Sequence, residues 1–92
     1  MDVDVRDNPA ESRFEAEVDG LMAIADYHIE GGSMVFTHFH VPSQFRGQGI
    51  GEDLARTALD AARAGGMHVV PRCPFMVSFI EEYPEYQDLV KS

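Results

Sequence analysis

One stretch of the sequence constrains the fold more than any other, and it reads Arg46-Gly47-Gln48-Gly49-Ile50-Gly51. It follows an apolar, β-branched segment at residues 34–41 and precedes a helix-forming segment at residues 52–64. Glycines at a helix start leave backbone N–H groups unpaired and uncovered, and the helix dipole adds partial positive charge there. The sequence therefore predicts a strand, a phosphate-binding turn and a helix, in this order.

Two other phosphate-binding patterns do not fit this stretch. A Walker loop ends in Gly-Lys-Ser or Gly-Lys-Thr, and the only lysine of the chain is Lys91. A dinucleotide fingerprint, G-x-G-x-x-G, needs a glycine at its sixth position, which is Glu52 when the pattern starts at Gly47. Taken by itself, the stretch could also be a glycine-rich turn that binds no ligand.

The residues before the turn predict a meander of three antiparallel strands. Apolar and charged residues alternate over residues 14–18, as in a half-buried strand. Asp19-Gly20 is a strong hairpin signal, and residues 21–29 supply the returning strand. A second turn with two glycines leads into the third strand at residues 34–41.

After the turn the hydrophobic period becomes helical and continues until Gly65. A short strand follows at residues 67–70, and a right-handed crossover makes it parallel to the strand at residues 34–41. Pro74 suits the first turn of a second helix that runs to about Glu82. The predicted fold is α+β, with a meander, a βαβ crossover and a short C-terminal helix in a single domain at residues 1–92.

Composition excludes several classes of partner. The formal net charge of −9 argues against nucleic acid, because phosphate backbones require a basic surface. No apolar run approaches the length of a membrane span. One cysteine, Cys73, cannot form an internal disulfide, and this fits a reducing cytoplasm. We expect a cytoplasmic protein without membrane or nucleic-acid partners, as a monomer or weak dimer.

Four segments together extend the comparison beyond the glycine turn, namely His38-Phe39-His40-Val41, the stretch from Arg46 to Gly51, Val69-Val70-Pro71-Arg72-Cys73-Pro74-Phe75, and Pro84-Glu85-Tyr86-Gln87-Asp88-Leu89-Val90. In order and spacing they resemble a family of very small, single-domain GNAT-type N-acetyltransferases, the YjdJ-like or NATD-like group. With the N-terminal meander, the resemblance covers nearly the whole chain. It implies a truncated GNAT-like fold, without the helical pair and final strands of larger members.

The resemblance implies acetyl-coenzyme A (acetyl-CoA) as cosubstrate and a primary amine as acceptor, such as a protein lysine or a small polyamine. In GNAT folds two parallel strands splay apart, and the pantetheine arm lies in the gap between them. The main chain of Val41 would then contact the pantetheine. The pyrophosphate would be held by the turn, namely Arg46, Gly47, Gln48, Gly49, Ile50 and Gly51.

Cys73 is a candidate catalytic residue at the end of the second parallel strand. A helix N-terminus lowers the pKa of a thiol, and Arg72 would add positive charge, so we predict a thiolate near the acetyl group. The thiol could accept the acetyl group transiently. The alternative is a small buried hydrophobic residue, which is the commonest role of a free cysteine.

His40 is the candidate general base, because an imidazole can take a proton at neutral pH. It stands where some relatives carry a carboxylate, and it shares a strand face with His38. Either histidine could instead be a hydrogen-bonded structural residue. A metal site formed by the two histidines with Cys73 lacks an evident fourth ligand, so no metal is predicted.

Two functions of different classes remain open. The first is an acetyl-CoA-dependent N-acetyltransferase acting on a primary amine. The second is a coenzyme A-binding module with little or no turnover that acts through a protein partner. The short acceptor region favours the second function, and the position of Cys73 favours the first.

Overall fold

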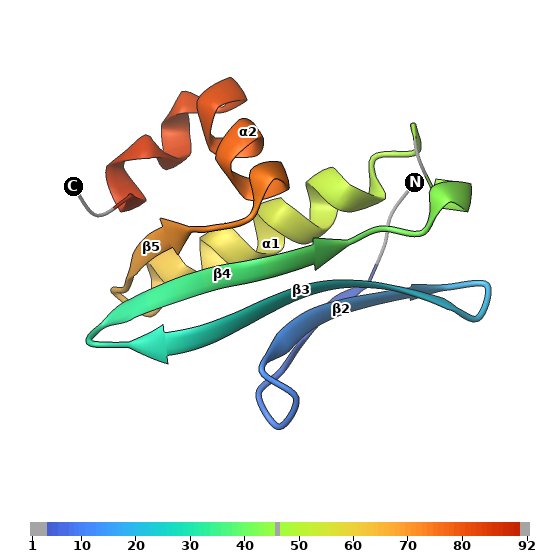
Figure 1. The fold of residues 1–92 in the computed structure, drawn as a ribbon, viewed down its shortest axis with the longest axis horizontal. Helices are drawn as coiled ribbons and strands as arrows, with labels where there is room; N and C mark the ends of the chain where they lie inside the picture. The colour runs from blue at the N-terminus through green and yellow to red at the C-terminus, as the bar shows by residue number, and fades with distance from the viewer. Residues whose placement is uncertain (1–3, 46, 91–92) are drawn as a thin grey trace.

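The computed structural model describes residues 4–45 and 47–90 (Figure 1). Its elements in chain order are β1 (Val5–Asn8), β2 (Arg13–Val18), β3 (Leu21–Glu30), β4 (Ser33–His40), the 3₁₀ turn η1 (Ser43–Phe45), α1 (Ile50–Ala64), β5 (His68–Pro71), α2 (Pro74–Glu82) and the 3₁₀ turn η2 (Pro84–Leu89). The predicted α+β class is confirmed. None of the helices in the described ranges is long and apolar enough to cross a bilayer.

In the described ranges five strands form one sheet in chain order, and β5 is parallel to β4 while the other neighbours are antiparallel. The predicted meander of three strands was wrong by one strand, because β1 pairs with β2 from Val5 opposite Ala16 to Asn8 opposite Arg13. The sequence of β1, Val-Arg-Asp-Asn, lacks the apolar alternation that marks a half-buried strand. Its pairing partner, not its own pattern, makes it a strand.

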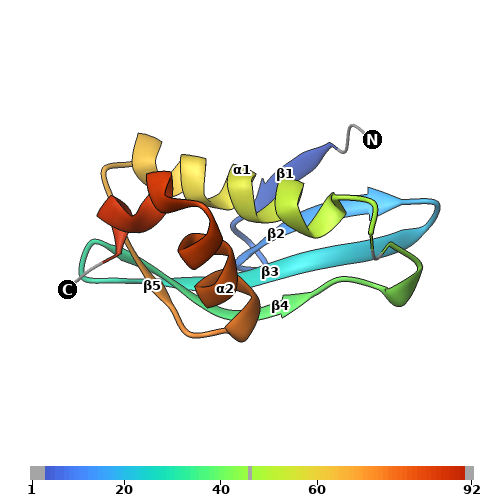
Figure 2. The ribbon, with the colours of Figure 1, turned by 90° about the horizontal axis from the view of Figure 1, so that it is seen from above.

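Helix α1 begins at Ile50 and covers one face of the sheet, where it packs against β1, β2, β3 and β5 (Figure 2). Its buried residues recur at helical spacing, and they are Ile50, Gly51, Leu54, Ala55, Ala58, Leu59 and Ala62. Glu52 and Asp53 lie in its first turn, where carboxylates complement the helix dipole. The predicted end at Gly65 is confirmed.

Helix α2 lies beside α1, since the guanidinium of Arg56 is 5.8 Å from the ring centre of Phe79. The segment after α2 forms η2, which the sequence did not predict. Arg63 of α1 holds it by hydrogen bonds of 2.9 Å to the carboxylate of Asp88 and 2.7 Å to the carbonyl of Glu85. The 3₁₀ turn therefore closes over the C-terminal half of α1.

Strand β4 contains a β-bulge at Thr37. Tyr27 of β3 lies opposite Phe36, but the preceding residue, Asp26, lies opposite His38. A bulge inserts one extra residue, so the side chains after it change faces. Phe39 consequently joins Phe36 on the face covered by α1, opposite the buried Ala25.

Candidate functional site

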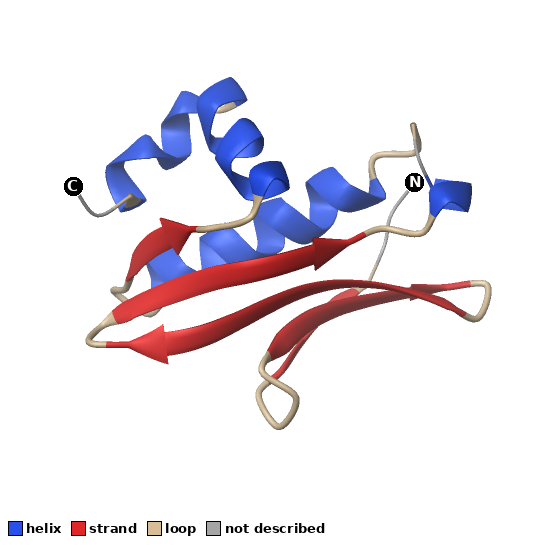
Figure 3. Cartoon of the chain, in the orientation of Figure 1, coloured by secondary structure: helices blue, strands red, loops and turns tan. Residues whose placement is uncertain are grey.

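The two parallel strands separate halfway along β4. Their pairing ends where Phe36 lies opposite Pro71, and the backbone N–H of Arg72 makes the last hydrogen bond, 2.9 Å to the carbonyl of Phe36. Strand β4 continues well beyond the end of β5, while the chain turns into α2 (Figure 3). Within the described ranges no strand pairs with residues 37–40 on this side. This stretch of β4 therefore has a backbone edge that could pair with an amide-containing ligand.

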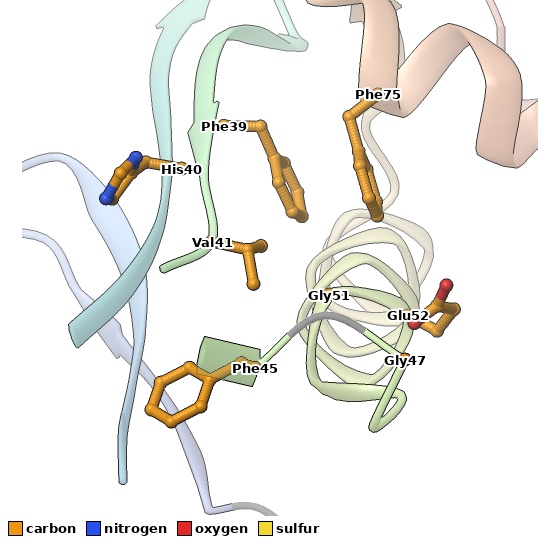
Figure 4. A pocket seen from close by; sticks show the side chains of 8 residues that line it. All are labelled: Phe39, His40, Val41, Phe45, Gly47, Gly51, Glu52 and Phe75. Carbon is orange, nitrogen blue, oxygen red and sulfur yellow. The ribbon is translucent and has the colours of Figure 1, made fainter. Parts of the chain in front are cut away.

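A cavity of about 430 Å³ opens between this edge and the start of α1. The residues that line it are Phe39, His40, Val41, Phe45, Gly47, Gly51, Glu52 and Phe75 (Figure 4). One end is formed by the glycine turn, and the other end is formed by two aromatic rings. Ligand pockets commonly range from about 300 to 1,000 Å³, so this cavity can take the arm of a cofactor rather than a whole coenzyme A molecule.

The glycine turn has the geometry of an open cradle. Gly47 and Gly49 have φ angles of 81° and 80°, a conformation that side chains disfavour. Atoms added at their Cβ positions would meet nothing within 4 Å, so the space beside both residues is empty. Gly49 is the N-cap of α1 and no side chain caps this helix, which leaves N–H groups of the first turn available to a ligand.

Gln48 and Ile50 have structural roles besides their backbone N–H groups. The Gln48 amide donates a hydrogen bond of 3.0 Å to the carbonyl of Gln44, which ties the turn to η1. The side chain of Ile50 is fully buried in the core. Only the main chain of Ile50 could therefore bind a phosphate. Arg46, the remaining residue of the predicted set, lies outside the described residues.

Gly51 is required by packing. A Cβ atom at this position would lie 2.9 Å from Cζ of Phe75 and 3.3 Å from Cγ2 of Val41. The absence of a side chain lets α1 approach β4 and α2 closely. Val41 itself lines the cavity, as its predicted contact with a pantetheine arm requires.

Sequence analysis missed four residues that line the cavity. Phe39 and Phe75 form its aromatic end, and their ring centres are 4.2 Å apart with nearly parallel planes. Phe45 and Glu52 lie toward the glycine end. Phe39 and Phe75 belong to the segments that carried the resemblance, and this was the one signal that could have pointed to them.

Cys73 is the N-cap of α2, as predicted, but its surroundings oppose the predicted activation. Its side chain is buried, with 4% of the residue exposed, and Cys73 does not line the cavity. Burial raises the pKa of the Cys73 thiol, and this outweighs the opposing effect of the backbone N–H of Met76. Burial therefore favours the protonated thiol, whereas the sequence predicted a thiolate.

His40 reaches the cavity wall, but its ring points away from the cavity (Figure 4). The bulge explains this orientation. His38 and His40 lie opposite Asp26 and Ile24, on the sheet face that α1 does not cover. The orientation of the ring gives no support to a role as the general base. In the part of the chain that the structure describes, no three His, Cys, Asp or Glu residues are placed to hold a metal ion.

Comparison with known proteins gives two matches. The model of the GCN5-related N-acetyl-transferase family matches residues 13–89. A solution structure of a GCN5-like protein from Staphylococcus aureus superposes with a TM-score of 0.78 at 22% identity, covering 97% of this chain and 88% of that one. No curated protein matches the sequence significantly.

The family match spans most of the chain, and the splayed strands with the glycine turn agree with it. The chain belongs to the GCN5-related N-acetyl-transferase family.

Proposed function

We propose that the protein is an N-acetyltransferase that binds acetyl-CoA and transfers the acetyl group to a primary amine. One observation carries the proposal: the open glycine turn at the start of α1 leads through the cavity to the unpaired edge of β4. Family membership supports the reaction class. The charge of −9 favours a cationic acceptor, such as a protein lysine or a small polyamine.

The residues present fit the cosubstrate. The cradle at Gly47 and Gly49 has no Cβ atom that would block a pyrophosphate, and the N–H groups that begin α1 point outward from the helix end. The amides of a pantetheine arm can pair with the free edge of β4 near Val41, as a neighbouring strand would. When bound, the thioester supplies an activated acetyl group beside this edge.

Transfer forms a C–N bond between the amine nitrogen and the thioester carbon, and it breaks the C–S bond to release coenzyme A. The amine must lose a proton before attack, and the departing thiolate must gain one. The thiol of Cys73 is buried and does not line the cavity, so it is poorly suited to be a covalent carrier or a proton donor. An amine that loses its proton to water needs no base from the protein, so the proposed transfer does not depend on His40.

The proposal includes the cellular setting that composition favours. A single cysteine fits a cytoplasmic protein, and the acidic charge speaks against nucleic acid as partner. We further propose that the protein acts as a monomer or weak dimer.

The test is transfer from acetyl-CoA to a panel of primary amines, including spermidine and a lysine-containing peptide. The amount of acetylated amine, measured by mass spectrometry, and the amount of released coenzyme A, measured by thiol titration, should increase together. Both rates should be proportional to the enzyme concentration. Acetyl-CoA at a hundredfold excess over its dissociation constant should also raise the free energy of unfolding by about 2.7 kcal/mol. If acetyl-CoA stabilises the fold but no acetylated product forms, the protein is a coenzyme A-binding module. If acetyl-CoA neither stabilises the fold nor acetylates an amine, the proposal is overturned.

A further inference from the structure

Two aromatic rings close the end of the cavity opposite the glycine turn. Phe39 comes from β4 and Phe75 from the first turn of α2, on the two sides of the gap between the parallel strands. Their ring centres are 4.2 Å apart and their planes differ by 8°. Both residues are half-buried, so each ring keeps one part in contact with the cavity.

The Phe75 ring packs against two neighbours. Its Cζ atom would be 2.9 Å from a Cβ atom at Gly51, so the ring already packs against the backbone of α1. Phe39 stacks on it from the side of β4. Pro74 precedes it and fixes the first turn of α2 through its restricted φ angle. These contacts hold the Phe75 ring at the end of the cavity.

The direction of a bound ligand follows from the two ends of the cavity. A ligand whose phosphates lie at Gly47 and Gly49 extends its arm along β4, past Val41, toward the two rings (Figure 4). The group at the end of the arm then meets the aromatic end. This step rests on the proposed function, because it takes acetyl-CoA as the ligand of the turn.

We propose that Phe75 determines which acyl-coenzyme A thioesters the site accepts, by limiting the acyl chain to about the length of acetyl. A longer chain needs the volume that the Phe75 ring fills. Displacing the ring would break its stacking on Phe39 and its contact with α1, and packed interiors resist such changes. The preferred substrate class is thus short-chain acyl-coenzyme A.

The test compares the dissociation constants of acetyl-coenzyme A and octanoyl-coenzyme A by titration calorimetry. In the wild-type protein, octanoyl-coenzyme A should bind at least about tenfold more weakly, since each excluded methylene changes affinity severalfold or more. Phe75→Ala should reduce this ratio at least about tenfold. The matched control is Val77→Ala on the exposed side of the same helix, which should keep the wild-type ratio within about twofold.

Circular dichroism establishes that each variant is folded. Phe75→Leu is the second variant, because it keeps an apolar side chain but removes the stacking, and it should reduce the ratio in the same direction. An unchanged ratio in folded Phe75→Ala or Phe75→Leu would overturn the inference, as would equal binding of both thioesters by the wild type. If the wild type binds coenzyme A but shows no discrimination, only this inference fails. If it binds no coenzyme A, the proposed function fails with it.

Discussion

Both helices of this protein begin beside the same gap in the sheet, but their N-termini differ in what they can do. Helix α1 begins at an open turn, with Gly49 as N-cap and empty space beside it. Helix α2 has the buried Cys73 as its N-cap and begins at Pro74, which has no N–H group to offer. The dipole is present at both ends, but only the exposed and uncovered one is suited to bind an anion.

At the second N-terminus, desolvation decides the chemistry. A thiolate at Cys73 would gain from the helix dipole, but it would lose its hydration in the apolar core. Burial raises the pKa of this thiol, so the loss is the larger effect. A helix N-terminus activates a cysteine only where water or a counter-charge reaches the sulfur.

The largest expected effect is on ligand binding at the first N-terminus. Gly49→Glu places a side chain and a like charge in the cradle, and it should weaken coenzyme A binding by about a hundredfold or more, since several charge-assisted hydrogen bonds are lost. Titration calorimetry measures the change.

Gly20→Glu is the matched control for this variant. Gly20 has nearly the same φ angle, 78°, and equally empty surroundings, but it lies in the hairpin between β2 and β3. The backbone strain of the two substitutions should be alike. Equal loss of coenzyme A binding in both variants would show that the turn at Gly49 is not the binding site.

The next largest effect is on stability, through the packing between the first turns of α1 and α2. Gly51→Ala introduces a Cβ atom 2.9 Å from Phe75, and overpacking of this kind should lower the free energy of unfolding by about 1–3 kcal/mol. Urea unfolding measures it. Gly65→Ala at the other end of α1 is the control, because its Cβ atom would meet mainly the flexible end of Met67, 3.2 Å away. Equal stability of the two variants would contradict the assigned packing role of Gly51.

A smaller effect should appear in the reactivity of the buried thiol. At pH 7.5, iodoacetamide should alkylate Cys73 at least about tenfold more slowly in the folded protein than in urea, because burial limits both the thiolate and access to it. Rapid alkylation of the folded protein would contradict this expectation and support the reactive thiolate that the sequence predicted. Cys73→Ala should then also abolish transfer, whereas we expect it to retain most of the activity.

The same raised pKa gives the stability a pH dependence with a definite sign. Above the ordinary pKa of a thiol, the unfolded chain releases its proton while folded Cys73 keeps it. The folded state then binds more protons, so the stability falls as the pH rises toward the raised pKa of the folded state. Urea unfolding between pH 7 and 10 measures this decrease in the free energy of unfolding. The Cys73→Ala variant should lack the part of the decrease that is due to the thiol. An identical decrease in the free energy of unfolding of the variant would show that other titratable groups cause it.

The smallest effect is expected at His40. Its ring points away from the cavity, so His40→Gln should leave the rate of transfer and its pH profile within about twofold of the wild type. A loss of about a hundredfold, as for removal of a general base, would show that the acceptor reaches the thioester from the opposite face of the sheet.

Much of the fold could be predicted because its signals are local. The turn at Asp19-Gly20, the glycines before α1 and the helical period after Ile50 each follow from the conformational preferences of a few neighbouring residues. The order of strand, turn, helix and parallel strand followed from them. So did the position of the glycine turn, which the structure shows as an open turn at the start of α1. Phosphate binding by this turn remains a prediction.

Only the tertiary structure decided what faces the cavity. The extra residue at Thr37 reverses the side chains that follow, so Phe39 faces the cavity and His40 does not. The sequence shows which residues alternate, but the pairing with β3 sets the register and therefore the face. In the same way, the sequence places Cys73 at a helix start, but the pKa of its thiol depends on burial by distant segments. Periodicity and turn chemistry are properties of neighbouring residues, whereas register and desolvation depend on residues that meet only in the folded chain.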